Sequence, residues 1–195
     1  KKEKTFMTMK KSVLPGALLA AGLAFHGGHA AEWKMEPADS RLAFTATFEK
    51  TPAPGVFRRF DVQLGLESAR PEAGHLDVSI DVASADMSSA DINKAIAGNE
   101  WFDFARFGRA EFHASETRRT QPNAFAAGGT LKLKGVQQAV DVPFSWNESG
   151  DAATMEGTFV VKRSAFGIGT GEWAATHVIG ADVTVAFKVR LRKSA

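Results

Sequence analysis

The segment Ala83–Ala114, ASADMSSADINKAIAGNEWFDFARFGRAEFHA, interrupts a chain that otherwise alternates like a series of β-strands. Ser89 or Ala90, followed by an apolar-periodic run and then Gly98, predicts a short helix. The sequence WFDFARF follows at once, with four aromatic residues in seven. A helix closed by an aromatic run can serve as a lid on a cavity, or as a crossover that seals an ordinary core. The segment by itself leaves both interpretations open.

Eight segments around this helix alternate between apolar and polar residues with a period of two. They are residues 42–48, 60–66, 76–82, 110–114, 131–133, 140–146, 155–161 and 183–191. The pattern is typical of an antiparallel sheet covered on one face. Eight such strands can form two packed sheets or close into a barrel whose interior is filled by side chains or holds one small ligand. We therefore expect a single all-β domain over residues 31–195, with one short helix and aromatic segment at about residues 91–107.

The connections between these segments carry proline, glycine and asparagine, which favour turns. They predict turns at residues 52–55, 70–74, 121–123 and 147–150. Pro143 lies within an alternating segment and cannot donate a hydrogen bond to a neighbouring strand. It therefore predicts a bulge or a sheet edge at that position.

The first thirty residues have the pattern of a secretory signal preceded by a short upstream stretch, residues 1–8. Met9 is followed by two lysines, by a mostly apolar run at residues 13–25, and by small residues up to Ala30. The apolar run is too short to span a membrane. We expect cleavage after about Ala30 and a mature chain in the periplasm.

Charge and cysteine content exclude several classes of function. Residues 1–30 hold five lysines and one glutamate, so the mature chain keeps 24 − 5 = 19 basic and 22 − 1 = 21 acidic residues, a formal charge of −2. No basic field remains for nucleic acid. The chain has no cysteine, which excludes disulfides, thiolate metal sites, cysteine catalysis and a lipid anchor on an N-terminal cysteine.

An outer-membrane barrel is the main structural alternative for an exported chain with eight strands. Such barrels turn apolar side chains outward between aromatic girdles. Here the outward face would be the one that carries Asp, Glu, Lys and Arg. The alternation therefore favours a barrel with its apolar face inward.

The apolar face is rich in aromatic residues that lack hydroxyl groups. Of 15 phenylalanines, Phe6 and Phe25 lie in the first thirty residues, which leaves 13 beside four tryptophans and no tyrosine. A phenylalanine-lined interior suits a long hydrocarbon better than a sugar, a nucleotide or a peptide. A solid, phenylalanine-rich core is the alternative, and composition does not decide between them.

Five motifs in order resemble the YceI-like family of periplasmic polyisoprenoid-binding proteins. They are WKMEPADSRLAF at residues 33–44, EWFDFARF at 100–107 after Asp91 and Ile96, AEF at 110–112, GTLKLKGV at 129–136, and RSAFGIG at 163–169 with GEW at 171–173 and residues 178–185. The resemblance covers essentially all of residues 31–192. It implies a lipocalin-like barrel that carries or sequesters an isoprenoid-like or fatty chain.

The resemblance, together with the inward alternation, predicts which side chains line the ligand pocket. They are Phe44, Phe60, Leu64, Val78, Ile80, Ile96, Trp101, Phe102, Phe104, Phe112, Leu131, Leu133, Phe144, Trp146, Phe159, Phe166, Trp173, Val185 and Phe187. The aromatic segment is expected to act as the lid.

Two charged residues are candidates for contact with a headgroup at the mouth. Asp91 is expected to cap the predicted helix, with headgroup contact as a second role. Arg163 is a candidate for pairing with an anionic head, or with an internal carboxylate in a structural ion pair. Gly167, Gly169 and Gly171 lack the pattern of a phosphate-binding loop and are interpreted as a bulge and turn.

An enzyme is the weaker alternative. His75, His113 and His177 are scattered and not at metal-ligand spacing. His75, Asp77 and Asp81 share one strand face and could form a divalent-ion cluster, although a solvated acidic face explains them more simply. No serine lies in a nucleophile-elbow pattern. We therefore predict no catalytic residue, no metal and no cofactor other than a bound polyprenyl or fatty acyl chain.

Three partner questions stay open at this stage. A solidly packed barrel that binds another protein and no ligand would have the same alternation. Transient contact with a membrane and a homodimer are both compatible with the sequence. No nucleic-acid partner is expected.

Overall fold

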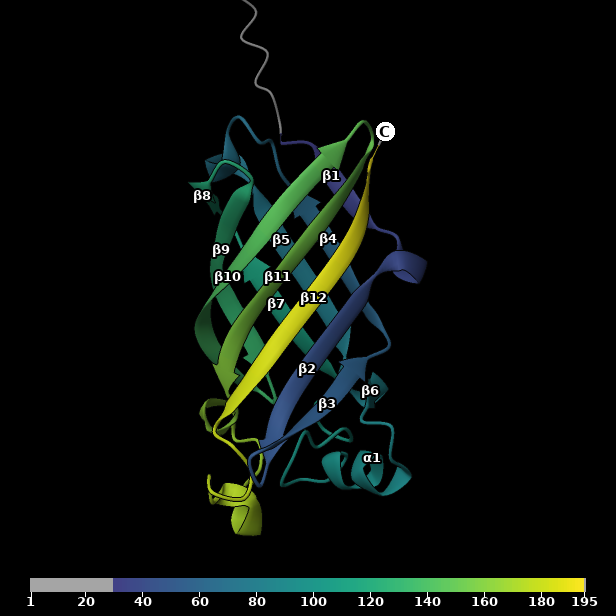
Figure 1. Cartoon of the computed structure of the whole chain (residues 1–195), viewed down its shortest axis with the longest axis vertical. Coiled ribbons are helices and arrows are strands. Elements are labelled where there is room, and N and C mark those ends of the chain that lie inside the picture. The colour runs from purple at the N-terminus through teal and green to yellow at the C-terminus, as the bar shows by residue number, and fades with distance from the viewer. Residues whose placement is uncertain (1–29, 195) are drawn as a thin grey trace, which may run out of the picture.

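Alternation with a period of two closes this chain into an antiparallel barrel, as the computed structural model shows for residues 30–194 (Figure 1). Nearly all of the predicted signal sequence and all of the stretch upstream of it, residues 1–29, lie outside these described residues. Within residues 30–194, no helix has both the length and the apolar character needed to cross a bilayer.

Eight antiparallel strands form the closed ring. In ring order they are β1 (Glu32–Met35), β4 (Phe60–Gly65), β5 (His75–Asp81), β7 (Arg109–Ala114), β9 (Ala124–Leu133), β10 (Val136–Ser149), β11 (Ala152–Lys162) and β12 (Asp182–Lys193). Pairing of β12 with β1 closes the ring. The predicted eight-stranded antiparallel barrel is confirmed.

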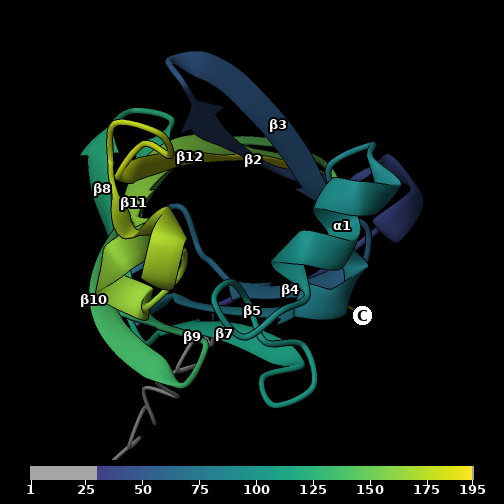
Figure 2. The same ribbon diagram turned by 90° about the horizontal axis from the view of Figure 1, so that it is seen from below.

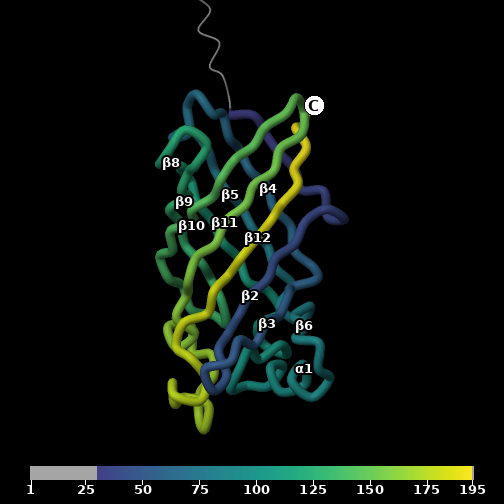
Figure 3. The backbone as a smooth tube through the Cα atoms, viewed as in Figure 1, coloured from purple at the N-terminus to yellow at the C-terminus, as the bar shows by residue number. Residues whose placement is uncertain are grey.

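Three further strands extend the wall beyond the ring at one end. Strand β12 pairs with β1 through its last residues and with β2 (Arg41–Phe48) through Thr184–Lys188. β2 pairs with β3 (Thr51–Phe57), which pairs with β6 (Ala85–Asp86). A short β8 (Thr117–Gln121) pairs with β9. The backbone tube in Figure 3 shows β2 and β3 reaching toward α1.

The helical elements are short. The helix α1 spans Ala90–Ile96, and the 3₁₀ turns are η1 (Pro37–Asp39), η2 (Pro71–Ala73), η3 (Val82–Ser84), η4 (Arg163–Phe166) and η5 (Gly171–Ala174). Helix α1 and the loops around η4 and η5 lie at the same end of the barrel, on opposite sides of its axis (Figure 2). We call this the α1 end; the last residues of β12 lie at the opposite end (Figure 1).

A continuous apolar core fills the end of the barrel opposite α1. Trp33 and Trp146 meet edge to face with ring centroids 5.0 Å apart, and Phe125 stacks on Phe144 at 5.7 Å. Leu64 and Leu191 in the same cluster are fully buried. This part of the interior is a continuous cluster of buried side chains, and such interiors are close-packed. We call it the solid core; it agrees with one of the two alternatives for the aromatic face.

The predicted turn at residues 52–55 is wrong, because these residues lie inside β3. Pro52 and Pro54 face Thr47 and Thr45 of β2 across the strand pair. The neighbour on the other side, β6, pairs with β3 at Val56 and Phe57. Proline cannot donate to a ladder but fits a strand edge, so the two prolines mark an edge here and not a turn.

The other predicted connections are close to those observed. Residues 70–74 join β4 to β5 and contain η2, and residues 122–123 form the turn between β8 and β9. The fourth turn is shifted, since β10 continues through Ser149 and the turn lies at residues 150–151. Pro143 pairs with β9 but lies outside the part of β10 that pairs with β11, as expected for a strand edge.

Candidate functional site

Helix α1 begins where its capping residue predicts. The hydroxyl of Ser89 accepts a hydrogen bond from the backbone N–H of Ile92 at 3.4 Å, so Ser89 is the N-cap. This satisfies one of the free N–H groups of the first turn. The expectation that Asp91 caps the helix is wrong, because Asp91 lies one residue inside the helix, in its first turn.

A carboxylate ties α1 to the edge of the barrel. Asp86 accepts hydrogen bonds from the backbone N–H of Ser88 at 2.8 Å and from the side-chain amide of Asn93 at 2.9 Å, and it pairs with Arg58. Asn93 in turn accepts from the backbone N–H of Met87 at 2.8 Å. These bonds, led by that from Asn93, lower the pKa of Asp86 to about 2. The network that holds the helix therefore favours the ionised form of Asp86.

The aromatic segment folds back onto the end of α1. The backbone N–H groups of Phe102, Asp103 and Phe104 donate to the carbonyls of Ile96, Gly98 and Ala97 at 2.9–3.2 Å. These carbonyls at the end of a helix would otherwise lack partners. The same contacts hold the aromatic rings beside the helix.

Rings from this segment pack against the extended wall. Phe102 stacks on Phe104 at 6.1 Å between ring centroids and meets Phe57 of β3 edge to face at 6.3 Å. Phe57 in turn packs against Phe44 of β2 at 5.1 Å. These rings, with Ile96 and Ala85, form a second and smaller apolar cluster at the α1 end.

Arg163 organises the loop between β11 and β12, residues 163–181, which lies across the barrel axis from α1. We call it the Arg163 loop. Its side chain is 3% exposed and donates five hydrogen bonds to backbone carbonyls, at 2.7–3.0 Å. The acceptors are the carbonyls of Ile168, Gly169, Trp173, Ile179 and Gly180. Burial lowers the pKa of the guanidinium. The expected structural ion pair is not found, since no carboxylate of residues 30–194 pairs with Arg163.

The glycines after Arg163 allow the loop to wrap around it. Gly167, Gly169 and Gly171 all have positive φ, at 63°, 70° and 61°, which side chains with a Cβ rarely adopt. A Cβ on Gly169 would also collide with the Arg163 guanidinium. The backbone N–H of Gly169 donates to the carbonyl of Glu100 at 2.7 Å, so this loop is tied to the aromatic segment.

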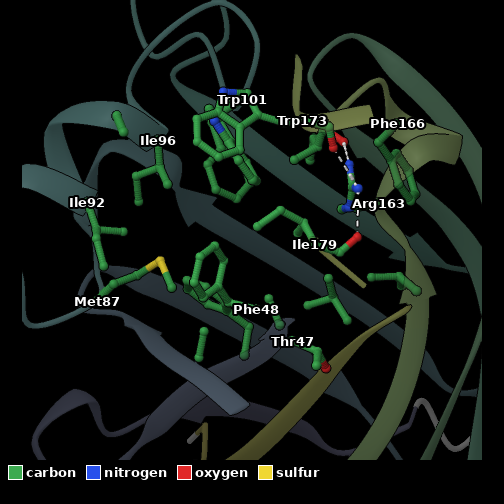
Figure 4. A pocket seen from close by; sticks show the side chains of 18 of the residues that line it. Thr47, Phe48, Met87, Ile92, Ile96, Trp101, Arg163, Phe166, Trp173 and Ile179 are labelled. Carbon is green, nitrogen blue, oxygen red and sulfur yellow. Dashed lines mark hydrogen bonds between the residues drawn. The ribbon is translucent and has the colours of Figure 1, made fainter. Parts of the chain in front are cut away.

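A cavity of about 440 Å³ lies between α1, the aromatic segment, the Arg163 loop and the ends of β2, β3, β9, β11 and β12 that face them (Figure 4). Its volume is within the range of about 300–1,000 Å³ usual for small-molecule pockets. Nineteen of the 22 lining residues are apolar and three, Thr47, Asp91 and Arg163, are polar. The apolar ones are Phe44, Ala46, Phe48, Ala53, Phe57, Met87, Ile92, Ala95, Ile96, Trp101, Phe102, Leu133, Val161, Phe166, Ile168, Trp173, Ile179, Val183 and Val185.

The cavity opens at a rim that carries exposed apolar side chains. Phe48, at the end of β2, is 45% exposed and Ile92, on α1, is 44% exposed, although both line the cavity. Trp101 and Trp173 pack together with ring centroids 5.8 Å apart (Figure 4). They bring the aromatic segment and the Arg163 loop into contact across one side of the cavity.

The structure brings ten of the predicted site residues to this cavity. They are Phe44, Ile96, Trp101, Phe102, Leu133, Phe166, Trp173 and Val185, with the two mouth candidates Asp91 and Arg163. Of these, Asp91 is exposed and Arg163 is buried.

The remaining predicted residues lie elsewhere in the barrel. Leu64, Phe112, Phe144 and Trp146 are buried in the solid core, and Phe60, Val78, Leu131, Phe159 and Phe187 are half-buried against it. Phe104 packs in the cluster beside α1, and Ile80 faces Phe60 across the pair β4–β5. All of these except Phe104 share the inward face of their strands, so the alternation gave the correct face but not the position along the barrel axis.

Phe48 lines the cavity from the apolar face that alternation assigned to residues 42–48. Met87, Ile92, Ile168 and Ile179 line it from segments to which alternation assigns no inward face. These four residues lie in the turn before α1, in α1 itself and in the Arg163 loop. Phe48 and Ile179 form an isolated β-bridge that links β2 to the Arg163 loop. In the sequence, the lining residues outside the strands are marked only by being apolar residues in loops, and that feature does not by itself show that they face a cavity.

The histidines and aspartates singled out on β5 have separate partners. His113 contacts Asp77 at 2.5 Å, His75 lies 3.5 Å from Glu32, and Asp81 pairs with Arg59. Among residues 30–194, no three His, Asp or Glu side chains converge as metal ligands would. These contacts lie on the outer surface. His113 and Asp77 join the neighbouring strands β7 and β5, whereas His75 reaches Glu32 of β1 across Gly65 of β4.

Comparison with known proteins gives matches along nearly all of the described chain. A family model described as the YceI-like domain matches residues 33–191. A UPF0312 protein of Pseudomonas putida strain W619 is 27% identical over 94% of this chain and 96% of its own. The crystal structure of Burkholderia cenocepacia BcnA is 31% identical, with a TM-score of 0.78 over 80% of this chain and 98% of that one.

A more distant structure has the same fold. It is a polyisoprenoid binding domain from Saccharophagus degradans, with 16% sequence identity and a TM-score of 0.69 over 85% of this chain and all of that domain. At this level of identity the match concerns the barrel architecture.

Proposed function

The chain belongs to the YceI-like family, and from this premise we propose that it is a periplasmic lipid-binding protein. It holds the hydrocarbon chain of an isoprenoid-like or fatty lipid in the cavity at the α1 end, and so carries or sequesters that lipid. The observation that carries this proposal is the nearly complete apolar lining of a cavity of about 440 Å³.

The lining favours a hydrocarbon on energetic grounds. Each buried methylene contributes about 0.8 kcal/mol, and a smooth apolar wall makes no demand on the ligand for hydrogen bonds. A sugar or a nucleotide would lose hydrogen bonds to water that three polar lining side chains could hardly replace. An extended apolar chain is therefore the ligand that gains most from this cavity.

The comparisons support the same class of ligand. The Saccharophagus degradans domain, whose barrel resembles this one, is described as polyisoprenoid binding. The solid core at the opposite end limits the space to the α1 end, so we expect the lipid tail to enter beside Phe48 and Ile92 and its head to stay near the rim. The signal-like pattern of residues 9–30 supports export to the periplasm.

Two neighbouring valines on β11 offer a matched test. Val161 lines the cavity, whereas Val160 is 56% exposed on the outer face. Val161→Trp fills part of the cavity, and Val160→Trp adds the same side chain outside it. We expect native mass spectrometry with the C20 prenyl alcohol geranylgeraniol to show one bound molecule for the wild type and for Val160→Trp, and none for Val161→Trp.

Thermal denaturation of the same proteins separates loss of binding from loss of fold. Geranylgeraniol should raise the melting temperature of the wild type and of Val160→Trp, because a ligand that binds the folded state alone stabilises it. A folded Val161→Trp protein that binds the alcohol as tightly as the wild type would disprove the assignment of the cavity. Failure of the wild type to bind any long-chain alcohol would disprove the proposed function.

A further inference from the structure

Two charged side chains line the cavity, and they differ in what they can offer a ligand. Arg163 is the cation and Asp91 is the anion. A guanidinium has five N–H groups, and all five of Arg163 donate to backbone carbonyls at 2.7–3.0 Å. An anionic oxygen that entered the cavity would therefore find no free donor on Arg163 unless the loop around it opened.

Asp91 is exposed at the rim, in the first turn of α1. A carboxylate or phosphate head placed there would face a like charge, and deeper in the cavity it would lose its hydration without a charged hydrogen-bond donor in exchange. The lysine on the same helix, Lys94, is exposed and does not belong to the lining. Neither position therefore favours an anionic head.

The rest of the lining offers a head almost no hydrogen-bond donors, because the atoms that face the cavity are nearly all apolar. An uncharged head, such as that of an alcohol, an ester or a ketone, costs much less to remove from water than a charged one. Such a head can therefore accompany its chain to this cavity without a charged partner there.

We propose that this cavity selects lipids by the charge of the head, accepting long chains with an uncharged head and discriminating against the same chains with a carboxylate or phosphate. This inference rests on the proposed function, since it assigns the ligand class of the same cavity. Arg163 contributes to this selection because its donors are all bonded to the loop and none is free for an anion. Asp91 contributes by repelling anions at the rim.

The test compares two probes with one chain. Geranylgeraniol and geranylgeranoic acid share the C20 isoprenoid chain and differ in the head, which is ionised in the acid at about pH 8. Binding is measured by isothermal titration calorimetry below the concentration at which either probe forms micelles. We expect the alcohol to bind at least about tenfold more tightly than the acid.

Charge variants test whether the residues at the rim set this ratio. Asp91→Asn should narrow the ratio of the two affinities by about two- to fivefold, the size of one interaction between exposed charges. Asp61→Asn removes the same charge on β4, where Asp61 is exposed and outside the lining, and should keep the wild-type ratio.

The outcomes separate this inference from the proposed function. Equal affinities, or tighter binding of the acid, would overturn the selection by charge while lipid binding itself stands. An acid affinity that falls in Lys94→Gln would overturn it as well, because an exposed lysine would then be the anion site. Binding of neither probe would overturn both proposals.

Discussion

Arg163 is the residue whose replacement most directly tests how the wall of the cavity is built. Arg163→Met keeps much of the apolar stem and removes all five donors. Three of the five acceptor carbonyls belong to the buried residues Ile168, Gly169 and Ile179. At about 1 kcal/mol for each buried carbonyl left without a partner, the lower end of the usual range, the variant loses about 3 kcal/mol.

This loss should appear in one of two ways. If the whole barrel unfolds together, the melting temperature falls by about 6–12 °C, at about 2–4 °C per kcal/mol for a domain of this size. If the loop opens by itself, the amide protons of Ile168 and Gly169, which bond to the carbonyls of Arg163 and Glu100, exchange about 100-fold faster. Thermal unfolding and hydrogen exchange together therefore capture both results.

The neighbouring Lys162 provides the control. It lies exposed on the outer face and pairs with Asp182 at 3.1 Å, so Lys162→Met should cost less than about 1 kcal/mol. If Arg163→Met is as stable as Lys162→Met and its loop amides exchange at the wild-type rate, Arg163 does not hold the loop, and the account of the cavity wall is wrong.

Three further predictions concern the other side of the α1 end. The pKa of Asp86 is lowered to about 2, chiefly by Asn93, so the ionised carboxylate contributes stability that is present above about pH 4 and lost as the pH falls toward 2. The difference in unfolding free energy between the wild type and Asp86→Asn, measured in urea, should close over that window. A constant difference would contradict this. Gly55→Ala places a Cβ against the ring of Phe44 and should cost about 1–3 kcal/mol in the same assay; a neutral effect would show that the ring is free to move. Ser89→Ala removes the N-cap of α1 and should cost about 1 kcal/mol, with faster amide exchange in the helix; unchanged exchange would argue against the cap.

The barrel and its helix were predictable because their signals are local. Inward residues of a strand recur every second position, so β5, β11 and β12 could be recognised without knowledge of their partners. Ser89 and Gly98 mark the ends of a helix by the chemistry of its free backbone groups. The edge strand β3 was missed because its two prolines also suit a turn, and β8 because all of its residues except Thr117 are exposed, so that it lacks an apolar face.

The division of the interior could not be predicted, because it depends on register. Phe44 and Phe144 both lie on the apolar face of an alternating segment, yet Phe144 stacks on Phe125 in the solid core and Phe44 lines the cavity. Which inward ring meets another ring is set by how the strands are paired around the barrel. The partners of Arg163 are backbone carbonyls of a folded loop, and a pattern of side chains cannot reveal them.

A crystal structure of the protein grown with geranylgeraniol would show directly whether the cavity holds the lipid chain. We expect continuous density for an extended chain between α1, the aromatic segment and the Arg163 loop, with the hydroxyl near the rim beside Phe48 and Ile92. Density for the chain on the outer face of the barrel, or a cavity closed by inward movement of Phe102 and Phe166 at saturating alcohol, would contradict it.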